Sequence, residues 1–214
     1  MSQIFERQYL DRGLASQRRY PNEALIRFIA SLNTKGKALE LGCGSGANLW
    51  MMAKEGFEAY GIDSAPTGLV FCKQMLDSYG VTATLIEGDM LKLPYSDEMF
   101  DVIFDVVSME SLDIEQHKTC INEILRCLKS GGSFFSYTLG DRSVSFQGKL
   151  VDEYTVENIT NGLPLANNGQ ICFLSPAKAR SLLSSFTEVH IESCTRTYKD
   201  MSQTIEYLSI TAKK

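Results

Sequence analysis

The sequence lacks several features that mark particular classes of protein. Its six cysteines form no CxxC pair, so neither a zinc site nor a disulfide framework has the required spacing. No dense run of lysine and arginine is present and the formal net charge is −5, which argues against duplex nucleic acid, because that binding depends on neutralising phosphates. We therefore expect reduced thiols, no metal, no nucleic-acid partner and a small substrate.

The beginning of the sequence has no apolar stretch of the kind that secretory signals need. Hydrophobic residues make up 44% and charged residues 22%, an ordinary globular composition that argues against a membrane protein or a disordered chain. We expect a cytoplasmic protein with no membrane partner. The two histidines, His117 and His190, fall on a predicted helix and a predicted edge strand, so we interpret both as structural.

The sequence does contain a repeated alternation of short apolar runs and helical periodicity, which predicts an α/β fold with a parallel sheet. The apolar runs predict strands at residues 38–41, 59–62, 82–86, 100–107 and 133–138, and later at 186–191 and 205–211. A length of 214 residues fits a single domain. We divide it into an N-terminal helical cap (1–36), a cofactor-binding core (37–139), an insertion or lid (140–172) and a C-terminal helix and hairpin (173–214).

A glycine-rich loop follows the first predicted strand and includes Gly42, Gly44 and Gly46. Glycines let the backbone turn tightly and approach a ligand without a Cβ clash. The helix behind the loop attracts an anionic group, either the pyrophosphate of a dinucleotide or the carboxylate of an amino-acid-like cofactor. Gly42, Gly44 and Ala47 also satisfy a relaxed nicotinamide fingerprint, so the loop alone leaves an NAD(P)-dependent oxidoreductase open.

Acidic residues at the ends of the predicted strands extend the pattern. Asp63 follows Gly42 by 21 residues, where an acidic side chain can accept hydrogen bonds from both ribose hydroxyls. With Glu40, the loop glycines and the Gly88–Asp89–Met90 segment, the sequence resembles the class I S-adenosylmethionine-dependent methyltransferases, whose glycine motif reads (D/E)xGxGxG. The resemblance covers roughly residues 37–135. It implies a Rossmann-like, seven-stranded, mostly parallel sheet with helices on both faces and a C-terminal antiparallel hairpin.

The resemblance implies S-adenosyl-L-methionine as the cofactor, with Asp89 receiving the adenine amino group. Ser64 replaces an apolar residue that usually packs on adenine, so Met90 or Leu91 takes that place unless both only fill the core. Asp105 lies in an apolar run and needs a partner, either the cofactor's ammonium or a structural group. Cys43 is assigned no chemistry. The expected cofactor-binding residues are Glu40, Gly42, Cys43, Gly44, Asp63, Ser64, Gly88, Asp89, Met90 and Asp105.

The candidate acceptor site follows the fourth predicted strand. There Glu110 and Ser111 stand where many related small-molecule enzymes carry two histidines, so Glu110 either orients or deprotonates the acceptor, or is a solvated carboxylate. The N-terminal arginines interleave with tyrosines and suggest an anionic or sugar acceptor, although a solvated helix face is the alternative. The expected substrate-binding residues are Arg12, Arg19, Tyr20, Ser111 and Tyr137, with Glu110 as the catalytic residue.

These observations predict methyl transfer to an oxygen or nitrogen of a small metabolite, with a carbohydrate or acidic sugar preferred. An NAD(P)-dependent oxidoreductase and a non-catalytic binding protein on the same fold remain alternatives. The sequence leaves the oligomeric state open.

We predict that S-adenosylmethionine and its demethylated product bind the chain and that NAD does not, because Asp89 has no standard counterpart in nicotinamide enzymes. Titration calorimetry compares the three ligands directly. Asp63→Ala removes charge-assisted hydrogen bonds of roughly 1.5 to 3 kcal/mol and should weaken binding about ten- to a hundredfold. Unchanged affinity in this variant would contradict the ribose-binding role.

Overall fold

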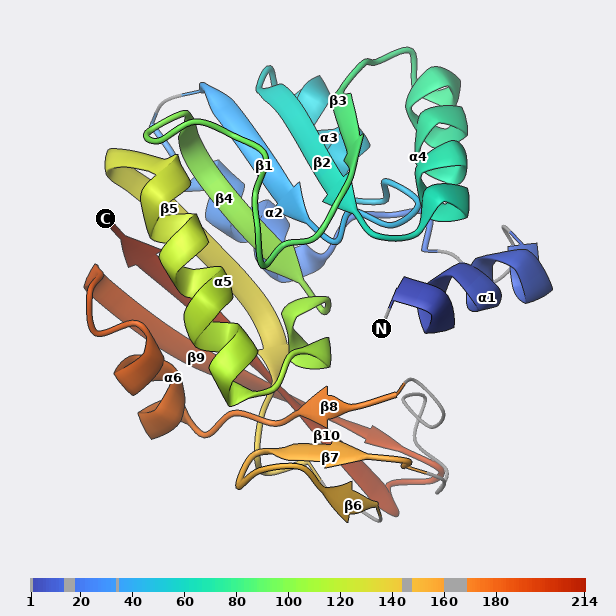
Figure 1. Cartoon of the computed structure of the whole chain (residues 1–214), viewed down its shortest axis with the longest axis vertical. Helices are drawn as coiled ribbons and strands as arrows, with labels where there is room; N and C mark the ends of the chain where they lie inside the picture. The colour runs from blue at the N-terminus through green and yellow to red at the C-terminus, as the bar shows by residue number, and fades with distance from the viewer. Residues whose placement is uncertain (1, 14–17, 34, 144–147, 160–168) are drawn as a thin grey trace.

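The computed structural model describes residues 2–13, 18–33, 35–143, 148–159 and 169–214. The strands of its main sheet are β1 (Lys37–Leu41), β2 (Glu58–Asp63), β3 (Thr84–Glu87), β4 (Phe100–Val106), β5 (Leu128–Leu139), β9 (Thr187–Tyr198) and β10 (Gln203–Lys213). Their order is β3-β2-β1-β4-β5-β10-β9 (Figure 1). The first five strands are parallel, whereas β10 runs antiparallel to both β5 and β9. The predicted fold, including its C-terminal hairpin, is confirmed.

Helices cover both faces of this sheet. They are α1 (Ser2–Arg12), α2 (Glu23–Ala30), α3 (Leu49–Lys54), α4 (Pro66–Ser78), α5 (Ile114–Cys127), α6 (Pro176–Leu182) and the short 3₁₀ helix η2 (Met109–Ser111). Helices α5 and α6 lie on one face, and α2 and α3 on the other (Figure 1). Each face has its own hydrophobic core; on the α2 face, the ring of Phe28 stacks on the buried ring of Phe135 at 5.0 Å between centroids.

Polar side chains set the beginnings of these helices. Asp113 and Gln116 form a capping box at the start of α5. At α2, the Asn22 side chain accepts the amides of Ala24 and Leu25, so the helix begins after Asn22.

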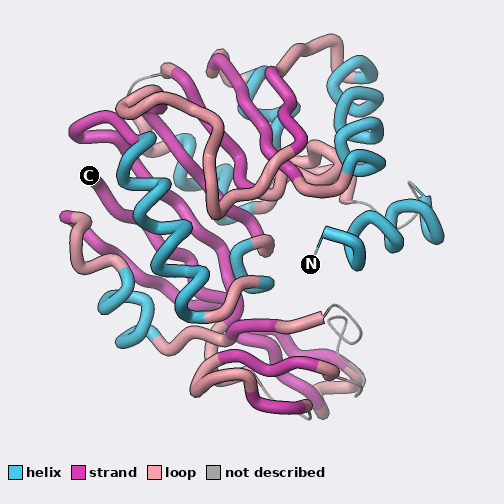
Figure 2. The backbone as a smooth tube through the Cα atoms, viewed as in Figure 1, coloured by secondary structure: helices cyan, strands magenta, loops and turns pink. Residues whose placement is uncertain are grey.

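The segment at residues 140–172, interpreted from sequence as a patternless insertion, contains a small antiparallel sheet. Its strands are β6 (Lys149–Leu150), β7 (Thr155–Glu157) and β8 (Ile171–Cys172). Figure 2 shows them beside the far ends of β9 and β10, where Val156 and Ile171 pack against Ile205. Strands of two or three residues carry too little periodicity to be recognised in a sequence. Residues 144–147 and 160–168 lie outside the described part, and the role of a lid stays a prediction.

The topology brings several loops to one edge of the sheet. The carboxyl ends of β1, β2, β3 and β4 meet there, because parallel strands point the same way. The order of the strands reverses at β1 and β4, where a crevice opens between the loops that leave the sheet on opposite faces.

Candidate functional site

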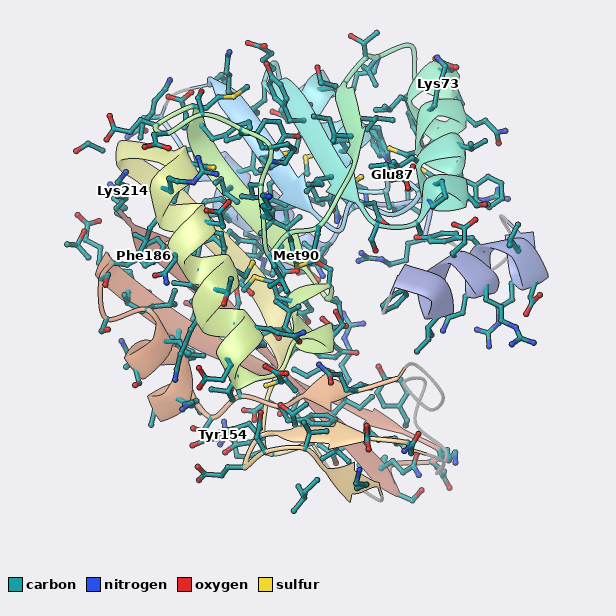
Figure 3. The ribbon with its side chains drawn as sticks, in the orientation of Figure 1. Lys73, Glu87, Met90, Tyr154, Phe186 and Lys214 are labelled. Atoms are coloured by element: carbon teal, nitrogen blue, oxygen red, sulfur yellow. The ribbon has the colours of Figure 1, made fainter. Side chains whose placement is uncertain are left out.

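A cavity of about 770 Å³ lies at this edge of the sheet. Nine of the ten predicted cofactor-binding residues line it: Glu40, Gly42, Cys43, Gly44, Asp63, Ser64, Gly88, Asp89 and Met90. Leu91, Glu110 and Ser111 line it as well. Figure 3 shows Glu87 and Met90 on this side of the sheet, with Glu87 nearer to α4 and Met90 nearer to α5. The loops that follow four different strands therefore share one cavity.

The glycine loop has a conformation that side chains would block. Gly42 has φ +62°, and a Cβ there would lie 2.4 Å from the Cβ of Ser108. Gly46 has φ +83°, and its Cβ would lie 2.6 Å from the sulfur of Cys72. Positive φ is readily adopted only by glycine, so both positions require it for backbone geometry and for space.

Asp63 fastens the glycine loop to the end of β2. Its Oδ2 accepts the amide of Gly44 at 2.7 Å, and its Oδ1 accepts the amide of Ala65 at 2.8 Å. Burial raises the pKa of Asp63, and these amide hydrogen bonds oppose the rise. Each carboxylate oxygen has a second lone pair with which to accept a ligand hydroxyl.

Glu40, the penultimate residue of β1, is 2% exposed, and one of its carboxylate oxygens has no hydrogen-bond partner among the described residues. Its Oε1 accepts the Asn48 side-chain amide at 2.7 Å, and Asn48 in turn accepts the backbone amide of Asn22. Its Oε2 has no hydrogen-bond partner among the described residues. Burial raises the pKa of Glu40 to about 8, against the opposing effects of the Asn48 bond and the charge of Arg18. A cation entering the cavity would relieve this cost.

Two of the residues predicted to bind the cofactor, Cys43 and Asp105, have hydrogen-bond partners within the protein. Cys43 hydrogen-bonds the thiol of Cys72, and this bond together with burial raises the pKa of Cys43 well above its usual value, in agreement with the absence of an assigned chemistry. Asp105 does not appear on the cavity wall. Its oxygens accept the amides of Ser108 and Met109 and the hydroxyl of Ser136, so of the two kinds of partner expected for Asp105 the structure contains the structural one. Its partners hold the turn after β4 in place.

That turn carries Glu110 and Ser111 to the cavity. Val107 has φ +57°, a strained conformation for a β-branched residue, and its amide donates to the carbonyl of Tyr137 at 2.8 Å. The chain then enters η2, where Glu110 is 8% exposed and its Oε2 has no partner among the described residues. Burial, followed by the nearby charge of Asp105, raises the pKa of Glu110 well above its usual value.

Helix α1 contributes a wall that the sequence did not assign to the cofactor region. Phe5 and Tyr9 line the cavity, and a Cβ on Gly44 would lie 2.5 Å from the Tyr9 hydroxyl oxygen. Glu6 holds the helix in place by accepting the backbone amide of Thr67 at the start of α4. The sequence of α1 gives no sign of these contacts, because they are made to the glycine loop and to α4, which lie far from α1 in the chain.

Four predicted substrate residues lie away from the cavity wall. Arg12 is exposed, Tyr20 is 73% exposed, and the carbonyl of Arg19 accepts the indole N–H of Trp50. Tyr137 is buried and stacks on Tyr207 at 5.0 Å between ring centroids. None of the four is among the lining residues, which include Arg18 instead.

Acidic residues outnumber basic residues in the lining of the cavity. Five carboxylate residues line the cavity, and Arg18 is the single basic residue among the described lining residues. No group of histidine, cysteine and carboxylate side chains in the described part of the chain is suited to hold a metal. The wall therefore favours a cationic or neutral ligand over an anionic one.

Comparison with known proteins identifies the core. Residues 38–132 match a family model described as a methyltransferase domain. The chain is 28% identical over 137 residues to the sterol 4-C-methyltransferase strm-1 of Caenorhabditis elegans, over 63% of this chain and 39% of that protein. The chain spans about half or less of the length of the first curated relatives that it matches.

Solved structures share the fold. The 1,6-didemethyltoxoflavin-N1-methyltransferase of Burkholderia thailandensis, with bound S-adenosylhomocysteine, has a TM-score of 0.73 at 16% identity, covering 100% of this chain and 86% of that one. The [4+2]-cyclase SpnF has a TM-score of 0.71 at 16% identity, covering 100% and 95%. Residues 38–132 thus match a methyltransferase domain in sequence, and the strand order agrees with the fold that the resemblance to class I S-adenosylmethionine-dependent methyltransferases implies. The prediction of S-adenosylmethionine as the cofactor is confirmed.

In the described part of the chain, no helix has both the length and the apolar character needed to cross a membrane.

The raised pKa of Glu40 predicts how stability responds to pH. Between its ordinary value of 4.5 and about 8, the folded carboxyl keeps a proton that the unfolded chain has lost, so this group's contribution to stability falls as pH rises. Glu40→Gln keeps an acceptor for Asn48 and removes the titration. Urea unfolding across this pH range should show wild type losing stability relative to Glu40→Gln. A difference that does not change with pH would contradict the raised pKa.

Proposed function

We propose that this chain transfers a methyl group from S-adenosylmethionine to an oxygen or nitrogen atom of a small metabolite. The observation that carries the proposal is the meeting of Glu40, Asp63 and Asp89 with the glycine loop around one cavity. The free oxygen of Glu40 fits the cofactor's ammonium, Asp63 fits the ribose hydroxyls and Asp89 fits the adenine amino group. The cofactor would supply a methyl group already activated by its sulfonium.

The chain's own residues would orient the reactants and exclude water. Methyl transfer needs an in-line approach in a dry cavity more than it needs covalent catalysis. Tyr9 and Phe5 of α1 bound the cavity on one side, and Ile4 at the start of this helix reaches toward Gly169 of the insertion, where an added Cβ would lie 2.9 Å from its terminal methyl. These contacts support the proposal that the N-terminal helix and the insertion enclose the acceptor.

The alternatives have less support. An NAD(P)-dependent oxidoreductase leaves Asp89 without a standard partner, whereas a methyltransferase uses it. A [4+2]-cyclase has a similar fold, so the fold by itself does not distinguish methyl transfer from another reaction. The preference for a carbohydrate or acidic sugar rests on the N-terminal arginines; Arg18 lines the cavity, whereas Arg12 and Arg19 do not, so this preference has less support.

The direct test is transfer of a labelled methyl group from S-adenosylmethionine to a pool of small metabolites passed through a size-exclusion filter. We expect label in a small molecule, and we expect Asp63→Ala to lose about ten- to a hundredfold in cofactor affinity through its lost hydrogen bonds. Label found in macromolecules alone, or no transfer despite cofactor binding, would sink the proposal.

We propose Glu110 as the residue that faces the acceptor. Its pKa lies well above its usual value, so an ionised Glu110 able to take a proton becomes more abundant as pH rises. Glu110→Gln preserves the shape and should lower turnover by roughly 10² to 10⁴, with cofactor affinity nearly unchanged. A role in orientation alone would give a smaller loss, and wild-type turnover in both Glu110→Gln and Glu110→Ala would exclude any role.

A further inference from the structure

Two other deeply buried carboxylates are well supplied with hydrogen-bond donors. Glu206 of β10 is fully buried and accepts the backbone amide and the guanidinium of Arg142. Asp105 is also fully buried, and it accepts two amides and the hydroxyl of Ser136. The fold thus satisfies these charges, as a buried carboxylate requires.

Glu40 and Glu110 differ from these residues. Each is more than nine-tenths buried, each keeps its Oε2 without a hydrogen-bond partner among the described residues, and both line the cavity. Under the proposed function the ammonium of the cofactor meets Glu40. Nothing in the cofactor remains for Glu110, because Asp63 and Asp89 take the ribose and the adenine.

The protein side of the cavity does not provide a counter-charge for Glu110. The charge of Asp105 has the same sign and raises the pKa of Glu110 further, whereas the charge of Arg18 lowers it. Arg18 is exposed to solvent and also acts on Glu40, so its effect is shared and screened. No hydrogen bond joins Arg18 to Glu110 among those of the described residues. A ligand that brings a donor or a cation would supply the partner that Glu110 lacks among the described residues.

We propose that the methyl acceptor carries a basic nitrogen and that Glu110 receives it, so that the substrate class is a small amine. This inference rests on the proposed function. A protonated amine supplies both a charge and N–H donors to the orphaned oxygen, whereas a hydroxyl supplies one donor and no charge. A carboxylate or phosphate would face five carboxylate residues around the cavity.

The neighbouring wall suits a small organic amine. Ser111 is fixed through its carbonyl, which accepts the side-chain amide of Gln170 from the insertion at 2.9 Å. The same amide lies 3.1 Å from the Oε1 of Gln116, which also lines the cavity. Leu112 and Phe5 add apolar surface to the lining. The lining residues that follow Glu110 in the chain are Ser111, Leu112 and Gln116, and none of them carries a charge, so Glu110 is the group in this stretch that can recognise a basic nitrogen.

The test measures binding of matched probes to the S-adenosylhomocysteine-bound protein by titration calorimetry. The probes are tryptamine, phenethylamine and n-butylamine, each beside its alcohol (tryptophol, 2-phenylethanol and 1-butanol), with 3-phenylpropionate as an anionic probe. We expect at least one amine to bind more tightly than its alcohol, and Glu110→Gln to weaken that amine about ten- to a hundredfold while leaving the alcohol unchanged. The matched control is Glu192→Gln, which removes an exposed carboxylate of β9 that does not line the cavity and should leave amine affinity close to wild type.

The outcomes separate this inference from the proposed function. Retained S-adenosylhomocysteine affinity shows that Glu110→Gln is folded. If that variant does not fold, the comparison of each amine with its alcohol in the wild-type protein still tests whether the cavity prefers a basic nitrogen. Alcohols or 3-phenylpropionate binding as well as the amines, equal amine affinity in Glu110→Gln, or no amine binding at millimolar concentration would overturn the inference. Failure of S-adenosylmethionine itself to bind would instead overturn the proposed function.

Discussion

The burial of negative charge at the carboxyl edge of a parallel sheet is the constraint on which this site depends. Strand ends deliver Glu40 and Asp63 there, and the turn after β4 adds Glu110. Burial raises the pKa of all three carboxyls, so their ionisation opposes folding unless a ligand supplies donors or charge. A ligand that brings donors or positive charge to these carboxyls would therefore stabilise the folded protein.

Internal hydrogen bonds decide which of these groups remain available. Oδ2 of Asp63 accepts a hydrogen bond from the Gly44 amide and so fixes the glycine loop. Asp105 gives its oxygens to the turn that follows β4, which sets the position of η2. Because these carboxylates hold the backbone, Glu40 and Glu110 are presented to the cavity on a rigid frame. Preorganisation of this kind reduces the entropy lost when a ligand is ordered.

Local pattern was enough to predict the strands, the glycine loop and the acidic residues after β1, β2 and β3. Each of these depends on neighbours in the chain, on alternation of apolar residues or on backbone freedom at glycine. The role of Asp105 was not predictable, because a buried carboxylate looks the same in sequence whether a ligand or Ser136 is its partner. Arg19 and Arg18 are adjacent, and sequence could not tell which of them reaches the cavity.

Contacts between distant segments account for the rest. The docking of α1 depends on Glu6 meeting Thr67, which is 61 residues away, and no local signal records that pairing. The short strands of the insertion are stabilised by packing against Leu139 and Ile205, which belong to strands far from them in sequence. Tertiary packing of this kind outweighs the weak intrinsic preference of such short segments.

The walls of the cavity come from separate parts of the chain. The loops that follow β1, β2 and β3 belong to one continuous stretch, whereas α1 lies outside it. Gln170 of the insertion does not line the cavity, but its side-chain amide donates to Ser111, which does. Changes in the length or composition of the outer segments leave the pairing of β1 with β2 and β4 in register. Selection can therefore reshape one side of the cavity through mutations in α1 without rebuilding the scaffold beneath it.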